Sequence, residues 1–213
     1  MKAAVWYAVG EPVVIKDVDI APTGPGEVKV RCAATAICHS DIHCVMGQTP
    51  FAPPMVPGHE TAGYVEEVGE GVTGLEKGDP VLVSAVISCG ECLHCVSGRS
   101  HLCEAEWLRD ANWPLTAADG KPIAHFSRVG GFAEYVLVDQ SQVVKLPGDM
   151  PLDRASLLAC GVITGFGAVA WRAKVELGKS CAIIGVGGVG LNSVQAAFLC
   201  GAYPVIAVDV NDA

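Results

Sequence analysis

The stretch Cys181-Ala-Ile-Ile-Gly-Val-Gly-Gly-Val-Gly190 joins a short apolar run to a glycine-rich turn, and the helix-compatible segment Leu191–Cys200 follows it. Glycines at this spacing between a strand and a helix are typical of a turn that holds the pyrophosphate of a dinucleotide. Gly185 makes the tight turn, Gly187 and Gly188 let the backbone approach the phosphates, and Gly190 allows the helix to pack closely on the strand. The stretch predicts the start of a doubly wound nucleotide-binding domain.

An acidic residue stands at the expected distance beyond this turn. Asp209 follows Gly190 by 19 residues and ends the apolar run Val205–Val208, which reads as the next strand. A carboxylate there accepts hydrogen bonds from both ribose hydroxyls and repels a 2′-phosphate. We therefore expect Asp209 to select NAD over NADP.

Composition and charge exclude two classes of partner. The 213 residues carry 14 Lys and Arg against 23 Asp and Glu, a formal charge of −9, without a basic cluster that would follow a phosphate backbone. A nucleic-acid partner is therefore not expected. Residues 180–208 carry no charge, but glycines and Pro204 divide this run into strand, turn, helix and strand, so it reads as buried α/β core rather than a membrane span.

The first 150 residues differ from the rest in their pattern. Short β-like runs are separated by turn signals such as Lys77-Gly-Asp79 and Pro147-Gly-Asp149. This spacing predicts a closed or partly closed β-barrel. We place a domain boundary at 152/153, with the barrel at 1–152 and the nucleotide-binding part at 153–213. The expected strands are Val13–Ile20, Glu27–Ala33, Thr61–Val68, Pro80–Ala85, Gly131–Val138 and Val143–Lys145.

Four cysteines stand at metal-ligand spacing. Cys89, Cys92 and Cys95 are separated by two residues each, and Cys103 follows after seven more. Four thiolates that converge in this way form the closed tetrahedron of structural zinc. An iron–sulfur cluster or plain buried thiols are the alternatives, but the Cys-Pro pair that usually ends a ferredoxin run is absent. In an intracellular chain this pattern favours zinc over disulfides.

A second set of metal ligands is less evident from spacing alone. Cys38 and His59 lie on turn-rich segments, and a catalytic zinc needs three protein ligands and one open position. A single histidine beside a glycine is more often an ordinary loop residue. The surrounding motifs strengthen the prediction that Cys38 and His59 are metal ligands.

Five motifs occur together and in order: Cys38-His-Ser-Asp41, Gly58-His-Glu60, the four-cysteine loop, Gly130-Gly-Phe-Ala-Glu-Tyr135 and Gly185-Val-Gly-Gly-Val-Gly190. This ordered set resembles the zinc-dependent medium-chain alcohol dehydrogenases over essentially the whole chain. The resemblance implies a fold of class α/β and β, in which a GroES-like β-barrel catalytic domain precedes a Rossmann nucleotide-binding domain. Since the chain stops just past the second strand, we expect that Rossmann domain to be incomplete.

The resemblance also assigns the residues of the catalytic centre. It makes Cys38, His59 and Cys160 the catalytic zinc ligands, places Glu60 behind the metal and lets Asp41 orient the His59 ring. Ser40 and His43 match the relay that carries the alcohol's proton to water; a solvated surface histidine is the alternative for His43.

On the cofactor side, the resemblance places His39 at the pyrophosphate and Thr164 and Val189 beside the nicotinamide ring. Packing within the helix and the loop is the alternative for Thr164 and Val189.

The implied function is a zinc-dependent oxidoreductase that transfers a hydride between an alcohol, or an aldehyde in reverse, and NAD. The alternatives are a glutathione-dependent formaldehyde dehydrogenase-like enzyme and a non-catalytic zinc-binding fragment. We expect a cytoplasmic protein without a membrane partner, a homodimer or homotetramer when complete, and 213 residues that are inactive alone. In the segment Glu104–Arg128, Trp107, Leu108 and Trp113 either line a channel for a bulky alcohol or, as we expect, pack on their own domain.

Overall fold

Alternating valines along several strands form the main core of Met1–Ala159, the first of two units into which the chain divides. In the computed structural model, which describes residues 1–211, every second side chain of these strands points to the same buried face. The buried set includes Val28, Val30, Val65, Val81, Val83, Val136 and Val138.

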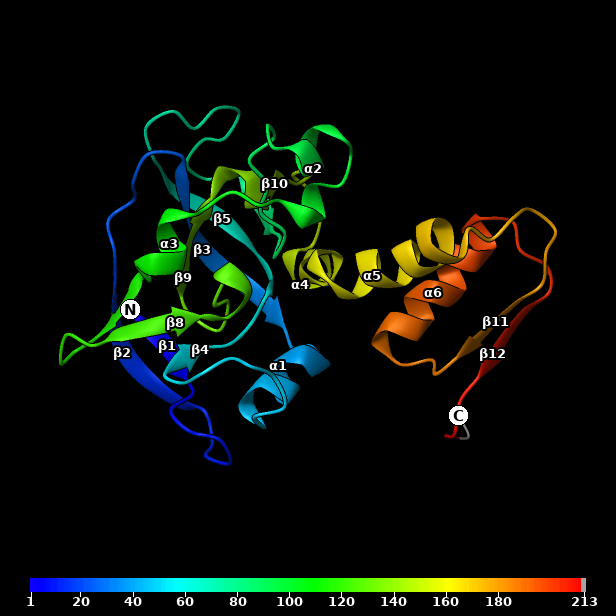
Figure 1. The fold of residues 1–213 in the computed structure, drawn as a ribbon, viewed down its shortest axis with the longest axis horizontal. Helices are drawn as coiled ribbons and strands as arrows, with labels where there is room; N and C mark the ends of the chain where they lie inside the picture. Colours follow the sequence, from blue (N-terminus) through cyan, green and yellow to red (C-terminus); the bar gives the residue numbers. More distant parts are fainter. Residues whose placement is uncertain (212–213) are drawn as a thin grey trace. The chain divides into compact units, whose positions relative to one another are not determined.

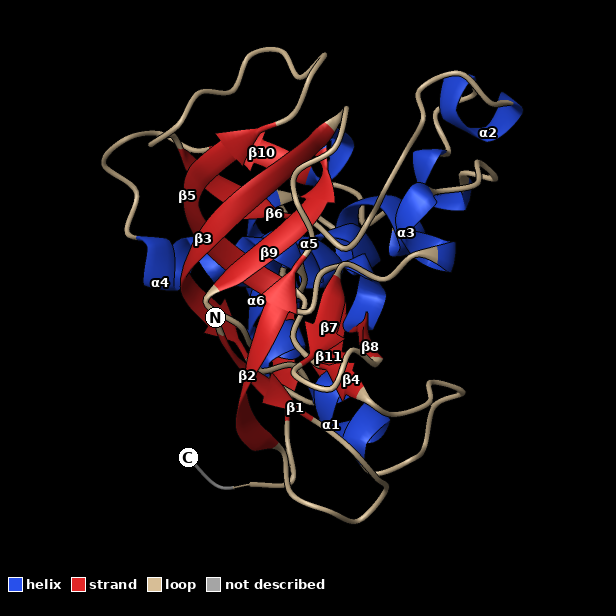
Figure 2. Ribbon diagram, turned by 90° about the vertical axis from the view of Figure 1, so that its left-hand side faces the viewer, coloured by secondary structure: helices blue, strands red, loops and turns tan. Residues whose placement is uncertain are grey.

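A five-stranded antiparallel sheet carries this core (Figures 1 and 2). Its order is β10-β6-β5-β3-β9, with bounds β3 (Glu27–Ala36), β5 (Glu60–Val68), β6 (Pro80–Val83), β9 (Tyr135–Asp139) and β10 (Val143–Lys145). Val30 pairs with Val65 on one side and with Val136 on the other, so the buried valines of neighbouring strands meet.

A second five-stranded sheet has the order β1-β2-β7-β8-β4. Its bounds are β1 (Lys2–Val5), β2 (Val14–Ile20), β4 (Met55–Val56), β7 (Leu115–Ala117) and β8 (Pro122–His125). The segment before β9 runs along β1, where Ala4 N donates to the Phe132 carbonyl at 2.8 Å and Ala3 bridges to Ala133. These links join the two sheets into the barrel-like arrangement that the sequence predicts.

The helical segments of the first unit are short. Those in the loops are α1 (His39–Val45), α2 (Leu93–Val96), η1 (Ser100–Leu102), α3 (Leu108–Ala111), η2 (Phe126–Arg128) and η3 (Gln140–Gln142). The last two, α4 (Leu152–Ala155) and η4 (Ser156–Ala159), pack on the barrel, where Ala155 and Leu158 join Ala62 and Leu82 in one apolar cluster.

The second unit begins at Cys160 and contains the predicted strand, turn, helix and strand. After α5 (Gly161–Gly167) and the π-helical segment η5 (Ala168–Ala173), strand β11 (Cys181–Ile184) leads through the glycine turn into α6 (Gly188–Leu199) and then β12 (Val205–Val208). The two strands are parallel, with Cys181 opposite Val205 and Ile184 opposite Val208. Ser193 of α6 donates to the Gly165 carbonyl at 3.2 Å and ties α6 to α5.

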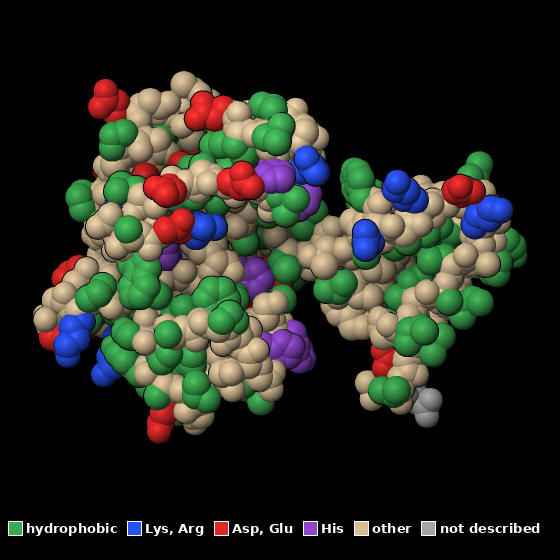
Figure 3. Space-filling view, viewed as in Figure 1, with side chains coloured by type: hydrophobic (Ala, Val, Ile, Leu, Met, Phe, Trp, Pro, Cys, Tyr) green, Lys and Arg blue, Asp and Glu red, His purple; other side chains and the backbone are tan. Residues whose placement is uncertain are grey.

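Large hydrophobic side chains are exposed on this second unit, as Figure 3 shows in green. Ile184, Phe198, Leu199 and Tyr203 are each at least 62% exposed. Within residues 1–211, no third strand pairs with β11 or β12.

Among the described residues, no single helix has both the length and the apolar composition needed to cross a bilayer. The consecutive segments Leu152–Ala159 and Gly161–Ala173 meet that requirement only when they are counted together.

Candidate metal centres and nucleotide loop

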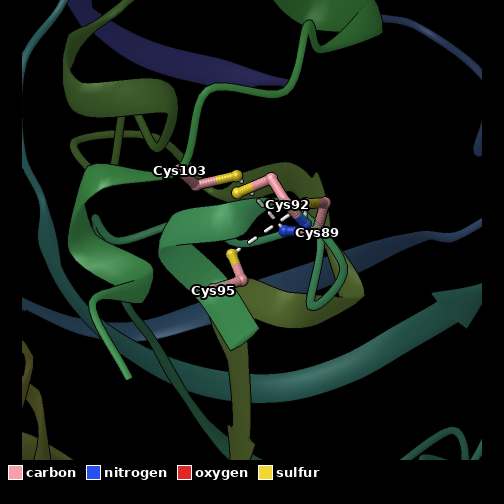
Figure 4. Close-up of side chains that lie close together, drawn as sticks. All are labelled: Cys89, Cys92, Cys95 and Cys103. Carbon is pink, nitrogen blue, oxygen red and sulfur yellow. Dashed lines mark hydrogen bonds between the residues drawn. The ribbon is translucent and has the colours of Figure 1, made fainter. Parts of the chain in front are cut away.

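Four cysteine thiols converge in the loop that contains α2 and η1 (Figure 4). The sulfurs of Cys89, Cys92, Cys95 and Cys103 all lie within 4.8 Å of one another, and those of Cys89 and Cys95 are 3.9 Å apart. Sulfurs on one tetrahedral zinc lie roughly 3.8 Å apart, given a Zn–S bond of about 2.3 Å. The donor set and its spacing therefore fit a zinc ion.

Backbone N–H groups point at these sulfurs. Cys92 N donates to Cys89 Sγ at 3.3 Å, and Cys89 N donates to Cys103 Sγ at 3.4 Å. Hydrogen bonds from the backbone of Cys95 and Glu104 lower the pKa of Cys92 to about 6, whereas desolvation and the neighbouring thiols raise the pKa of Cys95 to about 12. Four thiols this close cannot all ionise without a cation among them, and a structural metal ion compensates the negative charges of the thiolates.

The second cluster is organised by a buried carboxylate. Asp41, only 3% exposed, lies in the first turn of α1 and accepts hydrogen bonds from Cys38 N and Gly58 N, both at 2.9 Å. Its Oδ1 also lies 3.1 Å from His59 Nδ1. A carboxylate at Nδ1 keeps the proton on that nitrogen, so Nε2 carries the lone pair that a metal requires.

A glycine holds the histidine segment in place. Gly58 has φ +95°, and a Cβ there would lie 2.7 Å from Phe132 N, so no other residue fits without a shift of the backbone. The next residue, His59, is 5% exposed, and the ring of Phe126 contacts its ring edge to face with centroids 5.4 Å apart. The imidazole is thus held by a charge on one side and an aromatic ring on the other.

Cys38, His59 and Glu60 offer donor atoms within 4.8 Å of one another. Glu60 begins β5 and is 3% exposed. A thiolate, an imidazole and a carboxylate are all common zinc ligands, so this donor set fits zinc as well. Cys160 is the first residue of the second unit, where its thiol lies 3.7 Å from Thr164 Oγ1.

The two residues predicted to move the proton lie on α1. Ser40 Oγ is 3.6 Å from Cys38 Sγ, at the ligand end of the helix. His43 is exposed, and its ring lies edge to face with that of His39 at 5.0 Å. Ser40, His39 and His43 are all exposed.

The glycine turn between β11 and α6 has the geometry expected of a phosphate-binding loop. Gly185 adopts φ +86°, and a Cβ on Gly190 would collide with the Gly185 carbonyl oxygen. Gly187 caps the 12-residue α6, whose first N–H groups point out of the helix end. Val189 lies in the first turn and is 41% exposed.

Asp209 contacts this loop directly. Its Oδ2 accepts a hydrogen bond from Val186 N at 2.7 Å, and Oδ1 accepts from Val210 N at 2.8 Å. These backbone donors lower the pKa of Asp209, so the carboxylate is charged at neutral pH. Asp209 therefore stabilises the glycine loop through these hydrogen bonds, a role that the sequence did not predict.

Two contacts of this unit were not predicted from the sequence. Arg109 forms a bidentate ion pair with buried Glu27 at 2.6 and 2.7 Å, and Phe126 packs on His59. Both contacts join residues far apart in sequence, so no local pattern indicated them. Of the residues predicted either to line a channel or to pack on their own domain, Trp107 and Leu108 line a small cavity of the first unit and Trp113 lines a larger open one.

Comparison with known proteins agrees with this geometry. Residues 24–148 match the family described as "Alcohol dehydrogenase GroES-like domain". The chain is 41% identical to an alcohol dehydrogenase class-P of Arabidopsis thaliana, over 99% of this chain and 58% of that protein. The chain thus spans somewhat more than half the length of this curated relative.

Solved structures are similar over the same extent. An alcohol dehydrogenase zinc-binding domain protein from Burkholderia ambifaria superposes with a TM-score of 0.92 at 36% identity, over 99% of this chain and 59% of that one. Benzyl alcohol dehydrogenase from Acinetobacter calcoaceticus superposes with a TM-score of 0.87 at 33% identity, over 99% and 58%.

Proposed function

The chain belongs to the alcohol dehydrogenase GroES-like domain family, and from this we propose that it acts as a zinc-dependent oxidoreductase on alcohols, or on aldehydes in the reverse direction, with NAD. The observation that carries the proposal is the Asp41 carboxylate, which joins Cys38, Gly58 and His59 in one buried network. That network fixes a thiolate and an imidazole for one metal.

Cys38, His59 and Cys160 hold the catalytic zinc in this proposal, with Glu60 beside it. A zinc ion there supplies Lewis-acid polarisation of the alcohol or carbonyl oxygen. Asp41 keeps the His59 tautomer that presents Nε2 to the metal. The Phe126 ring against His59 keeps water from one side of the imidazole.

Ser40 and His43 move the proton. The Ser40 hydroxyl, at the ligand end of α1, accepts the proton of the alcohol as it releases its own, and exposed His43 passes the released proton to solvent. A relay of this kind suits a histidine because its charge changes near neutral pH.

NAD is the hydride acceptor when it is bound. Gly185, Gly187, Gly188 and Gly190 leave room for its pyrophosphate at the N-terminus of α6, and Asp209 accepts from the ribose hydroxyls. His39 contacts the phosphates, and Thr164 and Val189 lie beside the nicotinamide ring.

The remaining assignments concern the whole protein. We propose that Cys89, Cys92, Cys95 and Cys103 hold a structural zinc and that a GroES-like catalytic domain precedes the first part of a Rossmann domain. The sequence predicts these domains at 1–152 and 153–213, whereas the two compact units divide between Ala159 and Cys160, because α4 and η4 pack on the barrel. A homodimer or homotetramer in the cytoplasm, where cysteines at metal spacing remain reduced, is the assembly and compartment that we propose.

Zinc analysis combined with an NADH absorbance assay tests the proposal. For the full-length protein we expect two zinc ions per subunit and alcohol-dependent NADH formation, and Cys38→Ser is expected to abolish activity while one zinc remains. The 213 residues alone are expected to be inactive. Turnover restricted to hydroxymethylglutathione would favour the formaldehyde dehydrogenase-like alternative. Two zinc ions without turnover of any alcohol would favour the non-catalytic alternative.

A further inference from the structure

An open cavity of about 510 Å³ lies in the first unit. Its volume falls in the range of about 300–1,000 Å³ that is usual for small-molecule sites. Its large apolar lining residues are Phe51, Trp113 and the buried Met55. Phe51 is 43% exposed and Trp113 41% exposed, so both rings present a face that no side chain of the first unit covers.

A continuous row of rings leads from this cavity to the metal ligand. Phe51 packs edge to face on Phe126 with centroids 5.0 Å apart, and Phe126 packs in the same way on His59 at 5.4 Å. A ring bound against Phe51 therefore lies at the end of an aromatic row whose other end is the metal-binding imidazole. Aromatic rings favour such edge-to-face neighbours.

The positive groups in the cavity wall are all neutralised. Arg109 is paired with Glu27, and Arg128 donates to both carboxylate oxygens of Asp110 at 2.6 and 3.0 Å. The third group, His125, is 8% exposed, and burial lowers its pKa to about 4, so it is uncharged at neutral pH. Among the described residues of the wall, no cation remains to bind a carboxylate group of a ligand.

We propose that this cavity binds the ring of an uncharged aryl alcohol or aldehyde and that Phe51 and Trp113 determine this specificity. The inference rests on the proposed function and names its substrate class. It also disfavours substrates that carry a carboxylate, as glutathione adducts do.

Substrate comparison in the full chain tests the aromatic contact. Trp113→Ala is expected to lower kcat/KM for benzyl alcohol about tenfold or more, with kcat/KM for ethanol within about threefold of wild type. Phe51→Ala also removes a contact of Phe126 and is expected to lower kcat/KM for benzyl alcohol by more than it lowers kcat/KM for ethanol. Trp171→Ala is the matched control, because Trp171 is a 70% exposed tryptophan of the second unit. Equal losses for both alcohols in the cavity variants would overturn the proposal.

Comparing a neutral with a negatively charged substrate tests whether the arginines of the cavity wall are neutralised. Wild type is expected to use 4-carboxybenzyl alcohol at least about tenfold less well than benzyl alcohol. Asp110→Asn removes the partner of Arg128 and is expected to narrow that difference. A wild-type preference for the carboxylated alcohol would contradict the inference.

Ligand binding separates this inference from the proposed function. Saturation-transfer NMR is expected to detect benzyl alcohol on wild type and a much weaker signal on Trp113→Ala. If no alcohol is oxidised but this binding difference is found, the proposed function fails and the aryl site stands. If benzyl alcohol binds equally to both proteins, the aryl site is wrong whether or not alcohols are oxidised.

Discussion

The Asp41 carboxylate lies 3.1 Å from His59 Nδ1, and both residues are at most 5% exposed. The same carboxylate accepts hydrogen bonds from the backbone of Cys38 and Gly58, so one buried charge sets the positions of two segments that carry metal ligands. This relationship makes Asp41 the residue on which the geometry of the candidate metal centre depends most directly.

Replacing Asp41 with asparagine is expected to weaken zinc binding at this site by about 10- to 100-fold. Asparagine has one acceptor oxygen, so it cannot serve Cys38 N, Gly58 N and His59 together. Zinc titration against a competing chelator measures the effect, with the exposed Asp17→Asn as the control. Unchanged affinity in Asp41→Asn would show that the carboxylate does not support the metal.

Replacing Cys92 with serine is expected to remove the structural zinc and to lower the free energy of unfolding by more than about 4 kcal/mol, because the metal closes this loop. Denaturant unfolding and zinc content are the measurements. Cys200→Ser is the control, since Cys200 is half-buried and lies outside both ligand sets. A Cys92→Ser protein that keeps two zinc ions would refute the assignment.

Substitutions at Asp209 separate its proposed recognition of the NAD ribose from its hydrogen bond to the glycine loop. Asp209→Ser is expected to weaken NADH binding and to relax discrimination against NADPH. Asp209→Asn keeps an oxygen for Val186 N but loses the charge, so it is expected to relax discrimination with a smaller loss of NADH affinity. Fluorescence titration with both nucleotides gives the dissociation constants. If wild type already binds NADPH as well as NADH, the role given to Asp209 is wrong.

The buried His125 predicts a loss of stability in mild acid. Burial lowers the pKa of His125 from 6.5 to about 4. Between these two pH values the histidine is protonated in the unfolded chain but stays neutral in the folded chain. The free energy of unfolding therefore falls as the pH drops from 6.5 to 4, by an amount on the order of 3 kcal/mol. Denaturant unfolding across this range measures the slope, which is expected to be shallower in His125→Phe. Parallel curves for the two proteins would contradict the prediction.

The Glu27–Arg109 pair is expected to matter more for stability than an exposed pair. Glu27→Gln leaves the guanidinium of Arg109 with a weaker partner in a mostly buried site, and a loss of up to about 3–5 kcal/mol is expected. The exposed Lys2–Asp17 pair provides the comparison, where Asp17→Asn is expected to cost at most about 1 kcal/mol. If Glu27→Gln and Asp17→Asn lower the free energy of unfolding equally in thermal or denaturant unfolding, burial does not increase the contribution of the ion pair to stability.

Several features were predictable because they depend on residues close together in the chain. Four cysteines between Cys89 and Cys103 form their cluster within one loop, and the glycines from Gly185 to Gly190 form their turn between adjacent elements. The strand Val205–Val208 was also predicted with its observed bounds. Local spacing determines such geometry, because few bonds separate the groups that must meet.

The short strands of the second sheet were harder to predict. Lys2–Val5, Leu115–Ala117 and Pro122–His125 were not predicted as strands, since three or four residues carry too little alternation to distinguish a strand from a loop. Their pairing with distant strands, such as Ile20 opposite Leu115, supplies the hydrogen bonds that stabilise them.

The family resemblance, the four-cysteine loop and the glycine turn follow from the amino-acid sequence alone. The three-dimensional fold was needed to show that Phe126 packs on His59, that Glu27 neutralises Arg109, and that Trp113 lines an open cavity. These contacts join residues that lie on different strands and loops. The pairing of the two sheets and the packing of the loops between them bring such residues together, and a local pattern of residues does not encode that pairing.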